Sequence, residues 1–91
     1  MLKPSYTKQF DRDLKRVLKR GKDKKKIKHI IQRLINEEIL QAQYRDHKLS
    51  GNYKGRRECH IEPDWLLIYS VDKTNQEILF ERTGSHPDLF D

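Results

Sequence analysis

Apolar residues recur at helical spacing near the start of the chain. Downstream of Thr7 they fall on one face of a helix, at Phe10, Leu14, Val17 and Leu18. Thr7 can serve as the N-cap, and Gly21 stands where a left-handed residue would end the helix. The pattern therefore predicts a first helix between Thr7 and Gly21.

A second helix has the clearest periodicity in the sequence. Its apolar residues occupy the i, i+3, i+4, i+7 and i+8 positions of one face, namely Ile27, Ile30, Ile31, Leu34 and Ile35. Asp23 is a suitable N-cap. Because the linker after the first helix is short, we expect an antiparallel helical hairpin whose apolar stripes are buried against another element.

The second half of the chain has the pattern of strands. Three segments rich in apolar and β-branched residues are predicted strands, at Arg56–Glu62, Trp65–Val71 and Glu77–Arg82. A tight turn at Pro63–Asp64 and a polar loop join them, so neighbouring strands are expected to be antiparallel. The middle strand is almost entirely apolar, as is typical of a strand in mid-sheet or covered on both faces.

The remaining segments are predicted to be less regular. Residues 1–6 have weak strand character, and residues 41–55 are expected to form a loop or a short ragged strand. Residues 85–91 are too few for a regular element. Leu89 and Phe90, within that tail, are nevertheless expected to pack back on the domain.

Together these elements predict an α+β fold. Residues 1–91 form one domain, in which the N-terminal two-helix hairpin packs on a small, mostly antiparallel four- to five-stranded sheet. A chain of this length buries only about 60% of its unfolded surface, so any site should be a shallow surface groove. The sequence lacks a membrane-length apolar stretch and a secretory signal, which predicts a cytoplasmic protein. Its single cysteine, Cys59, excludes an internal disulfide.

Charge is distributed unevenly along the chain. Residues 1–33 contain 13 Lys and Arg against 3 Asp and Glu, whereas residues 34–91 contain 7 against 11. A basic block of this density is a candidate contact surface for nucleic-acid phosphates or for an acidic protein partner. A solvated helical face would have the same composition.

Three of the four histidines lie in the half predicted as sheet. His47, His60 and His86 could meet on one surface there, beside Asp64 and Arg82. Cleavage of RNA through its own 2′-hydroxyl needs a base, an acid and a cation that stabilises the phosphorane. Imidazole titrates near neutral pH and guanidinium matches phosphate oxygens, so these residue types suit that reaction without a metal or other cofactor.

Other chemistries fit these residues less well. The three histidines could ligate zinc with a carboxylate, but their spacing matches no compact zinc motif. No serine or cysteine nucleophile elbow is present. His29, on the second predicted helix, is expected to have no catalytic role.

Basic and aromatic residues flank the histidines in the sequence. Lys54, Arg56 and Arg57 resemble a strip that contacts phosphates. Trp65 could stack on a base or fill the core, and packing in the core is favoured. Phe90 carries the same ambiguity.

Residues 46–90 contain the pattern DHxLxG, then RxxHIxPDWLLIY, then RxGSHxxLF, after a half predicted to form two helices. This pattern and layout resemble the YafQ branch of the RelE-type toxins. The resemblance implies a microbial ribonuclease-like α+β domain and a ribosome-dependent mRNA interferase of a type II toxin–antitoxin system. A cognate antitoxin encoded beside it would bind and neutralise it.

The resemblance also implies roles for individual residues. His60 and His86 are the leading acid–base candidates, and Arg82 would stabilise charge on the scissile phosphate. Asp64 would position a histidine or the RNA, and His47 would assist proton transfer or contact phosphate. Two aromatic residues would shape the groove or support its walls, Trp65 and Phe90. The basic helices would engage ribosomal RNA.

Two other functions remain open at this point. A ParE-like toxin would share the fold but inhibit DNA gyrase by protein contact, and it should not need the histidine cluster. A plain basic RNA-binding module would explain the N-terminal charge alone. Replacement of His86 would separate this module from a nuclease, because only a nuclease would lose activity while keeping its affinity for the ribosome.

Overall fold

A single mixed sheet forms the middle of the molecule. The computed structural model describes residues 1–90, and over that range the sheet has five strands in the order β1-β5-β4-β3-β2. The strands are β1 (Lys3–Tyr6), β2 (His47–Lys48), β3 (Arg57–Glu62), β4 (Trp65–Asp72) and β5 (Glu77–Gly84). β1 pairs in parallel with β5 and the other pairs are antiparallel, which confirms the predicted fold class. Asp91, the last residue of the expected domain, lies outside the described residues.

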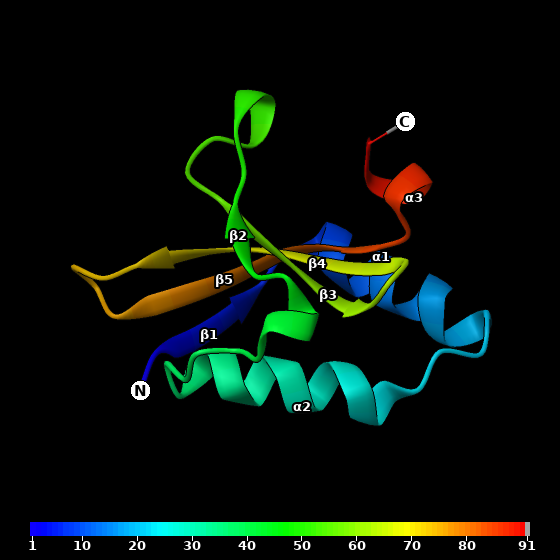
Figure 1. Cartoon of the computed structure of the whole chain (residues 1–91), viewed down its shortest axis with the longest axis horizontal. Coiled ribbons are helices and arrows are strands. Elements are labelled where there is room, and N and C mark those ends of the chain that lie inside the picture. The colour runs from blue at the N-terminus through cyan, green and yellow to red at the C-terminus, as the bar shows by residue number, and fades with distance from the viewer. Residues whose placement is uncertain (91) are drawn as a thin grey trace.

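Two longer helices begin and end where the sequence predicts. In α1 (Lys8–Lys19), the hydroxyl of Thr7 accepts a hydrogen bond from the Phe10 amide at 2.9 Å, and Gly21 takes a φ of +96° just after the helix. In α2 (Lys24–Ile35), Asp23 accepts from the Lys25 amide at 2.9 Å. Figure 1 shows the chain returning along α2 after α1, as a hairpin requires. Within the described residues, neither these helices nor any other could cross a membrane.

Both helices pack on one face of the sheet. Their apolar side chains meet every second residue of the strands, in a core that includes Phe10, Val17, Ile27, Ile30, Leu34, Cys59, Ile61, Trp65, Leu67, Tyr69, Ile78 and Phe80. Burial raises the pKa of the Cys59 thiol, so this cysteine serves packing rather than chemistry. The predicted burial of the helical stripes against a sheet is therefore confirmed.

The opposite face of the sheet carries a smaller apolar cluster. Leu66 and Ile68 point to this side of β4 and pack with Leu89, which confirms that the central strand is covered on both faces. Two short elements supply the cover, namely the 3₁₀ turn η2 (Gly51–Tyr53) and the helix α3 (His86–Phe90). Figure 1 shows them on the side of the sheet away from α2. We call this side the open face.

The expectation that the C-terminal tail forms no regular element was wrong. Ser85 and Asp88 cap α3 reciprocally, because the Ser85 amide donates to Asp88 at 2.9 Å and the Asp88 amide donates to the Ser85 hydroxyl at 3.3 Å. Leu89, 6% exposed, anchors the helix on the sheet. Capping and one buried leucine thus stabilise a helix of five residues, which is too short for periodicity to reveal.

The carboxylate of Asp13 joins α1 to β5. It is fully buried and accepts hydrogen bonds from the Arg82 Nε at 2.7 Å, from the Thr83 amide at 3.2 Å and from Arg16 at 3.0 Å. The Thr83 hydroxyl in turn accepts from the Trp65 indole at 3.0 Å. This network fixes the end of β5 from which α3 follows.

Replacing Asp13 with asparagine should destabilise the fold, because the variant leaves Arg82 without its charge partner in a mostly buried setting. Arg82 is a quarter exposed, so we expect a loss of about 2–3 kcal/mol, below the full value for a wholly buried pair. Urea denaturation measures it, with Asp11→Asn on the exposed side of α1 as the control. Equal stability of the two variants would contradict the assigned role of Asp13.

Candidate active site

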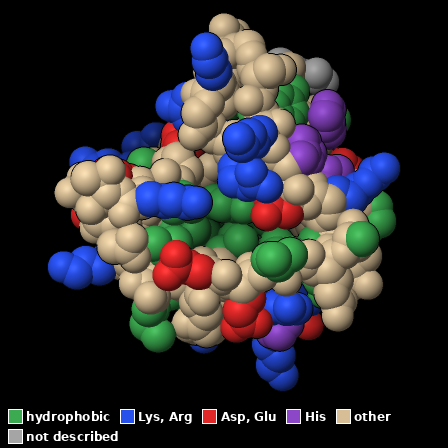
Figure 2. All heavy atoms as spheres, turned by 60° about the vertical axis from the view of Figure 1, so that its left-hand side comes forward, with side chains coloured by type: hydrophobic (Ala, Val, Ile, Leu, Met, Phe, Trp, Pro, Cys, Tyr) green, Lys and Arg blue, Asp and Glu red, His purple; other side chains and the backbone are tan. Residues whose placement is uncertain are grey.

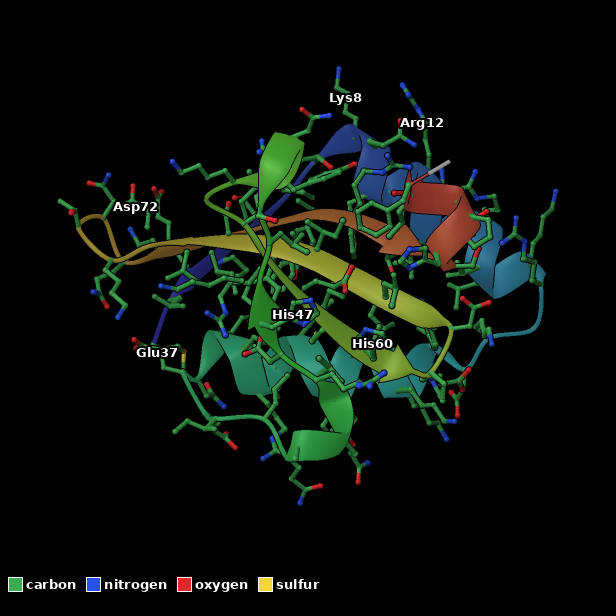
Figure 3. All side chains as sticks on the ribbon, turned by 45° about the horizontal axis from the view of Figure 1, so that its top comes forward. Lys8, Arg12, Glu37, His47, His60 and Asp72 are labelled. Atoms are coloured by element: carbon green, nitrogen blue, oxygen red, sulfur yellow. The ribbon has the colours of Figure 1, made fainter. Side chains whose placement is uncertain are left out.

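Two of the predicted catalytic histidines lie side by side on the open face. Cys59 and Ile61 of β3 point to the helices, so Glu58 and His60 point to the open face. His47 of β2 pairs directly with Glu58 in the sheet. Figure 3 shows His47 and His60 on these adjacent strands, and their ring centroids are 6.4 Å apart.

Glu58 lies between these two histidines. Its Oε2 is 3.3 Å from Nε2 of His47 and 3.4 Å from Nε2 of His60. Glu58 is only 5% exposed, whereas the side chain of His47 is 49% exposed. Sequence reasoning missed Glu58, although the two-residue period of β3 places it on the same face as His60.

A hydrogen bond links His86, at the start of α3, to Asp64, in the turn between β3 and β4. The Asp64 carboxylate, at the turn between β3 and β4, accepts a hydrogen bond from the backbone amide of His86 at 3.2 Å. The backbone carbonyl of Pro63 in the same turn is 3.2 Å from Nδ1 of His60. One turn therefore contacts both histidines. Figure 2 shows histidine side chains close together at the upper right of the view, and another apart from them near the bottom.

Aromatic side chains extend this part of the surface towards η2. The ring of Phe90 is 4.8 Å from that of His86 and 5.4 Å from that of Tyr53. Phe90 is 37% exposed, so it can contact a ligand. Trp65 is 1% exposed on the helical side, which confirms packing in the core over stacking on a base.

Arg82 lines a shallow hollow beside these aromatic rings. The hollow has a volume of about 470 Å³ and is lined by Thr7, Gln9, Asn52, Tyr53, Arg56, Glu81 and Arg82. Hydrogen bonds to Asp13 raise the pKa of Arg82, and partial burial opposes them, so the guanidinium stays charged. Since Asp13 binds Nε and one terminal nitrogen, the cation is held in a fixed direction.

The three flanking cations line a hollow whose lining residues include no histidine. Arg56 is ion-paired with Glu81 at 2.8 Å, and Arg57 with Asp46 at 3.3 Å. They line a second hollow of about 660 Å³ with Lys54, which is exposed. The structure thus gathers these cations in one basic hollow, although two of them already have acidic partners.

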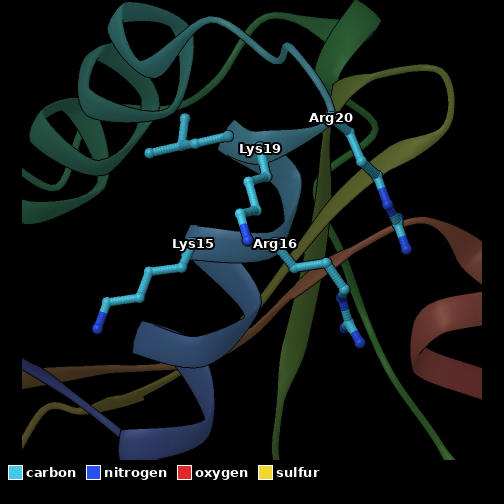
Figure 4. A pocket seen from close by; sticks show the side chains of 5 residues that line it. Lys15, Arg16, Lys19 and Arg20 are labelled. Carbon is cyan, nitrogen blue, oxygen red and sulfur yellow. The ribbon is translucent and has the colours of Figure 1, made fainter.

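A basic face of α1 lies next to α3. Figure 4 shows four cations lining a depression on this helix, with Arg16 and Arg20 extending towards β5 and α3. Arg20 binds both carboxylate oxygens of Asp88, at 2.7 and 3.2 Å. Its hydrogen bonds, with those from Ser85, hold the pKa of Asp88 well below its ordinary range. The helix that carries His86 is therefore fastened to α1.

Comparisons with known proteins identify the family of this chain. A model of the family described as "Bacterial toxin of type II toxin-antitoxin system, YafQ" matches residues 2–91. The chain is 46% identical over 86 residues to the mRNA interferase toxin YafQ of Escherichia coli strain K12, covering 93% of this chain and 91% of that one.

This chain belongs to the YafQ family of type II toxins. It superposes on YafQ in the crystal structure of the E. coli DinJ–YafQ complex with a TM-score of 0.91, 42% identity and complete coverage of both chains. These matches favour a YafQ toxin over the ParE-like alternative.

Another solved structure that is similar to this chain is described as metal-bound. It is a metal-bound toxin from Helicobacter pylori, with a TM-score of 0.92 and 41% identity over 99% of this chain and 100% of that one. Within residues 1–90 of the present chain, no three His, Cys, Asp or Glu side chains are arranged so that they could hold a metal ion. Metal dependence therefore calls for a direct test.

The stabilisation that Asp88 provides should depend on pH. A carboxyl group whose pKa is lowered by folding stabilises the folded state above its unfolded pKa of about 3.9, and this contribution is lost as pH falls through the folded pKa. Asp88→Asn should thus melt at a lower temperature than wild type at about pH 7, with a gap that shrinks below about pH 4. Thermal denaturation across this range tests it. A constant gap would contradict the role of the ion pair.

Proposed function

We propose that this protein is a ribosome-dependent endoribonuclease that cleaves messenger RNA and so inhibits translation. The observation that carries the proposal is the gathering of His47, His60, Asp64, His86 and Arg82 on and around one open face. The mRNA interferase activity named for the E. coli relative supports it.

The proposed reaction needs only the RNA and these side chains. A base removes the proton of the 2′-hydroxyl, and the 2′-oxygen attacks the adjacent phosphorus. The bond from phosphorus to the 5′-oxygen then breaks, and an acid protonates that oxygen. The products are a 2′,3′-cyclic phosphate and a 5′-hydroxyl end.

Each side chain has a role that follows from its surroundings. His60 and His86 are the leading acid and base, since one turn positions both of them. Arg82 stabilises the charge on the phosphorane, because Asp13 holds its guanidinium in one direction. Asp64 positions His86 through the backbone amide, and His47 assists proton transfer.

Several other groups shape the site and bind the partners. Phe90 forms part of the groove wall, and Trp65 supports the sheet beneath it. The basic faces of α1 and α2 engage ribosomal RNA, and the hollow lined by Lys54, Arg56 and Arg57 contacts phosphates. A cognate antitoxin neutralises the protein, as DinJ forms a complex with the E. coli relative. The protein acts in the cytoplasm, where translating ribosomes are found.

Replacing His86 with alanine should abolish cleavage without loss of ribosome affinity. We expect at least a 100-fold slower reaction, because the variant lacks one proton-transfer group. Primer extension on a reporter message, with and without translating ribosomes, measures the cuts. His29→Ala, an exposed histidine on α2, is the matched control. Cuts that persist in the His86 variant would refute its role, and no cuts with wild type would favour a target such as gyrase.

Cleavage should not depend on a bound transition metal. The acid, base and cation of the proposed reaction are all side chains, so a zinc- and copper-selective chelator should leave the rate unchanged while magnesium keeps the ribosomes intact. Primer extension before and after chelation provides the comparison. Activity that is lost on chelation and restored by zinc or copper would overturn metal independence.

A further inference from the structure

The helix α3 carries two of the proposed site residues, His86 and Phe90, whose rings are 4.8 Å apart. It has five residues, and isolated helices of this length are not stable in water. Its buried residue is Leu89, which anchors it on one side. Contacts from other elements must therefore fix where the two rings lie.

Asp88 joins α3 to the two elements beside it. Its carboxylate oxygens accept hydrogen bonds from both terminal nitrogens of Arg20, the residue that follows α1, at 2.7 and 3.2 Å. One of these oxygens also accepts from the Ser85 amide at 2.9 Å. The side chain packs closely on the end of β5, because a Cβ on Gly84 would lie 3.0 Å from Cβ and from Oδ2 of Asp88. One carboxylate thus connects α1, α3 and β5.

The geometry of the pair suits positioning more than global stability. Two N–H groups of one guanidinium bind the two oxygens of one carboxylate, which sets the direction as well as the distance of the contact. The side chain of Arg20 is 49% exposed and that of Asp88 is 13% exposed. Ion pairs with this exposure add only modestly to the stability of a whole domain. We therefore expect their main effect on the local order of α3.

The other polar contacts of α3 are single hydrogen bonds. The amide of His86 donates to Asp64 at 3.2 Å, and the hydroxyl of Tyr53 donates to the carbonyl of Leu89 at 3.4 Å. Among residues 1–90, the pair with Arg20 is the one ion pair that α3 makes. The rotation of this helix therefore depends most strongly on Asp88.

We propose that Arg20 and Asp88 are positioning residues that hold His86 and Phe90 in place for cleavage. This rests on the proposed nuclease function, in which His86 transfers a proton and Phe90 forms part of the groove wall. Asp88 acts through α3 rather than on the reacting atoms. Without the pair, α3 opens more often, and a smaller fraction of the molecules has both rings in place.

Amide hydrogen exchange measures the order of α3 without any need for cleavage. The Leu89 amide donates to the Ser85 carbonyl at 3.2 Å. In the ¹⁵N-labelled full chain it should exchange about three- to tenfold faster in Asp88→Asn than in wild type, because asparagine keeps an oxygen for the Ser85 amide but loses the charge. Asp11→Asn, the same substitution at an exposed position of α1, should leave that rate unchanged. Equal Leu89 exchange in wild type and Asp88→Asn would overturn the proposal.

Cleavage kinetics separate positioning from binding. With toxin in excess over ribosomes that carry message, Asp88→Asn should lower the maximal rate about three- to tenfold and leave the toxin concentration for half-maximal cleavage unchanged. Asp11→Asn should leave both quantities unchanged. A change confined to the half-maximal concentration would contradict a positioning role.

A double variant tests whether the two residues act as a pair. Arg20→Ala should also lower the maximal rate, and adding Asp88→Asn to it should cause no further loss, because the interaction is already absent. The comparison uses the maximal rate, since Arg20→Ala also removes a cation of the basic face of α1. Losses that multiply in the double variant would refute the pair.

Salt tests the pair in the unaltered protein, even if a variant does not fold. Exposed ion pairs are screened, so exchange of the wild-type Leu89 amide should speed up between about 0.05 and 0.5 M salt, while amides of β4 should not. An unchanged Leu89 rate would contradict the proposal. A wild-type protein in which the pair orders α3 but which cuts no message would refute the nuclease function alone.

Discussion

A single buried carboxylate, that of Asp13, holds the first helix against the last strand. It binds Arg82 through two nitrogens and also accepts from the Thr83 amide. Among residues 1–90, β1 pairs with β5 only as far as Phe80. Beyond it, the Thr7 hydroxyl donates to the Glu81 carbonyl and the Asp13 carboxylate accepts from the Thr83 amide. The direction of Arg82 and the start of α3 both depend on this interaction. The same carboxylate thus stabilises the fold and fixes the direction of the Arg82 guanidinium, the cation that we propose stabilises the scissile phosphate.

The two faces of the sheet are covered to different extents. The helices bury one face of the sheet in a continuous apolar core. Within residues 1–90, two short elements cover the open face, η2 and α3, and the side chain of His47 on that face is 49% exposed. The ion pair of Arg20 with Asp88 holds α3, on the open face of the sheet, to α1, on the helical face. A polyanion or an acidic partner that competed for Arg20 would therefore act directly on the helix that carries His86.

Local signals in the sequence were sufficient for most of the fold. Caps at Thr7 and Asp23 and the apolar periodicities predicted both helices, and segments rich in apolar and β-branched residues predicted three strands. The parallel pairing of β1 with β5 joins distant segments and has no local signal. Asp13 and Glu58 were missed because a lone carboxylate in a charged sequence shows no pattern until folding buries it. The three histidines, Arg82 and Asp64 were predicted as site residues from their types and their motif, without any knowledge of where they lie in space.

The central claim is that the open face cleaves RNA through the 2′-hydroxyl of the message itself. The most direct measurement replaces that one hydroxyl by hydrogen at the preferred cutting site of a reporter message and follows the cuts on translating ribosomes. The account predicts that cutting stops at the substituted nucleotide and continues at unmodified sites, with 2′,3′-cyclic phosphate ends. Cutting at the 2′-deoxy nucleotide, at the rate of the unmodified message, would contradict it.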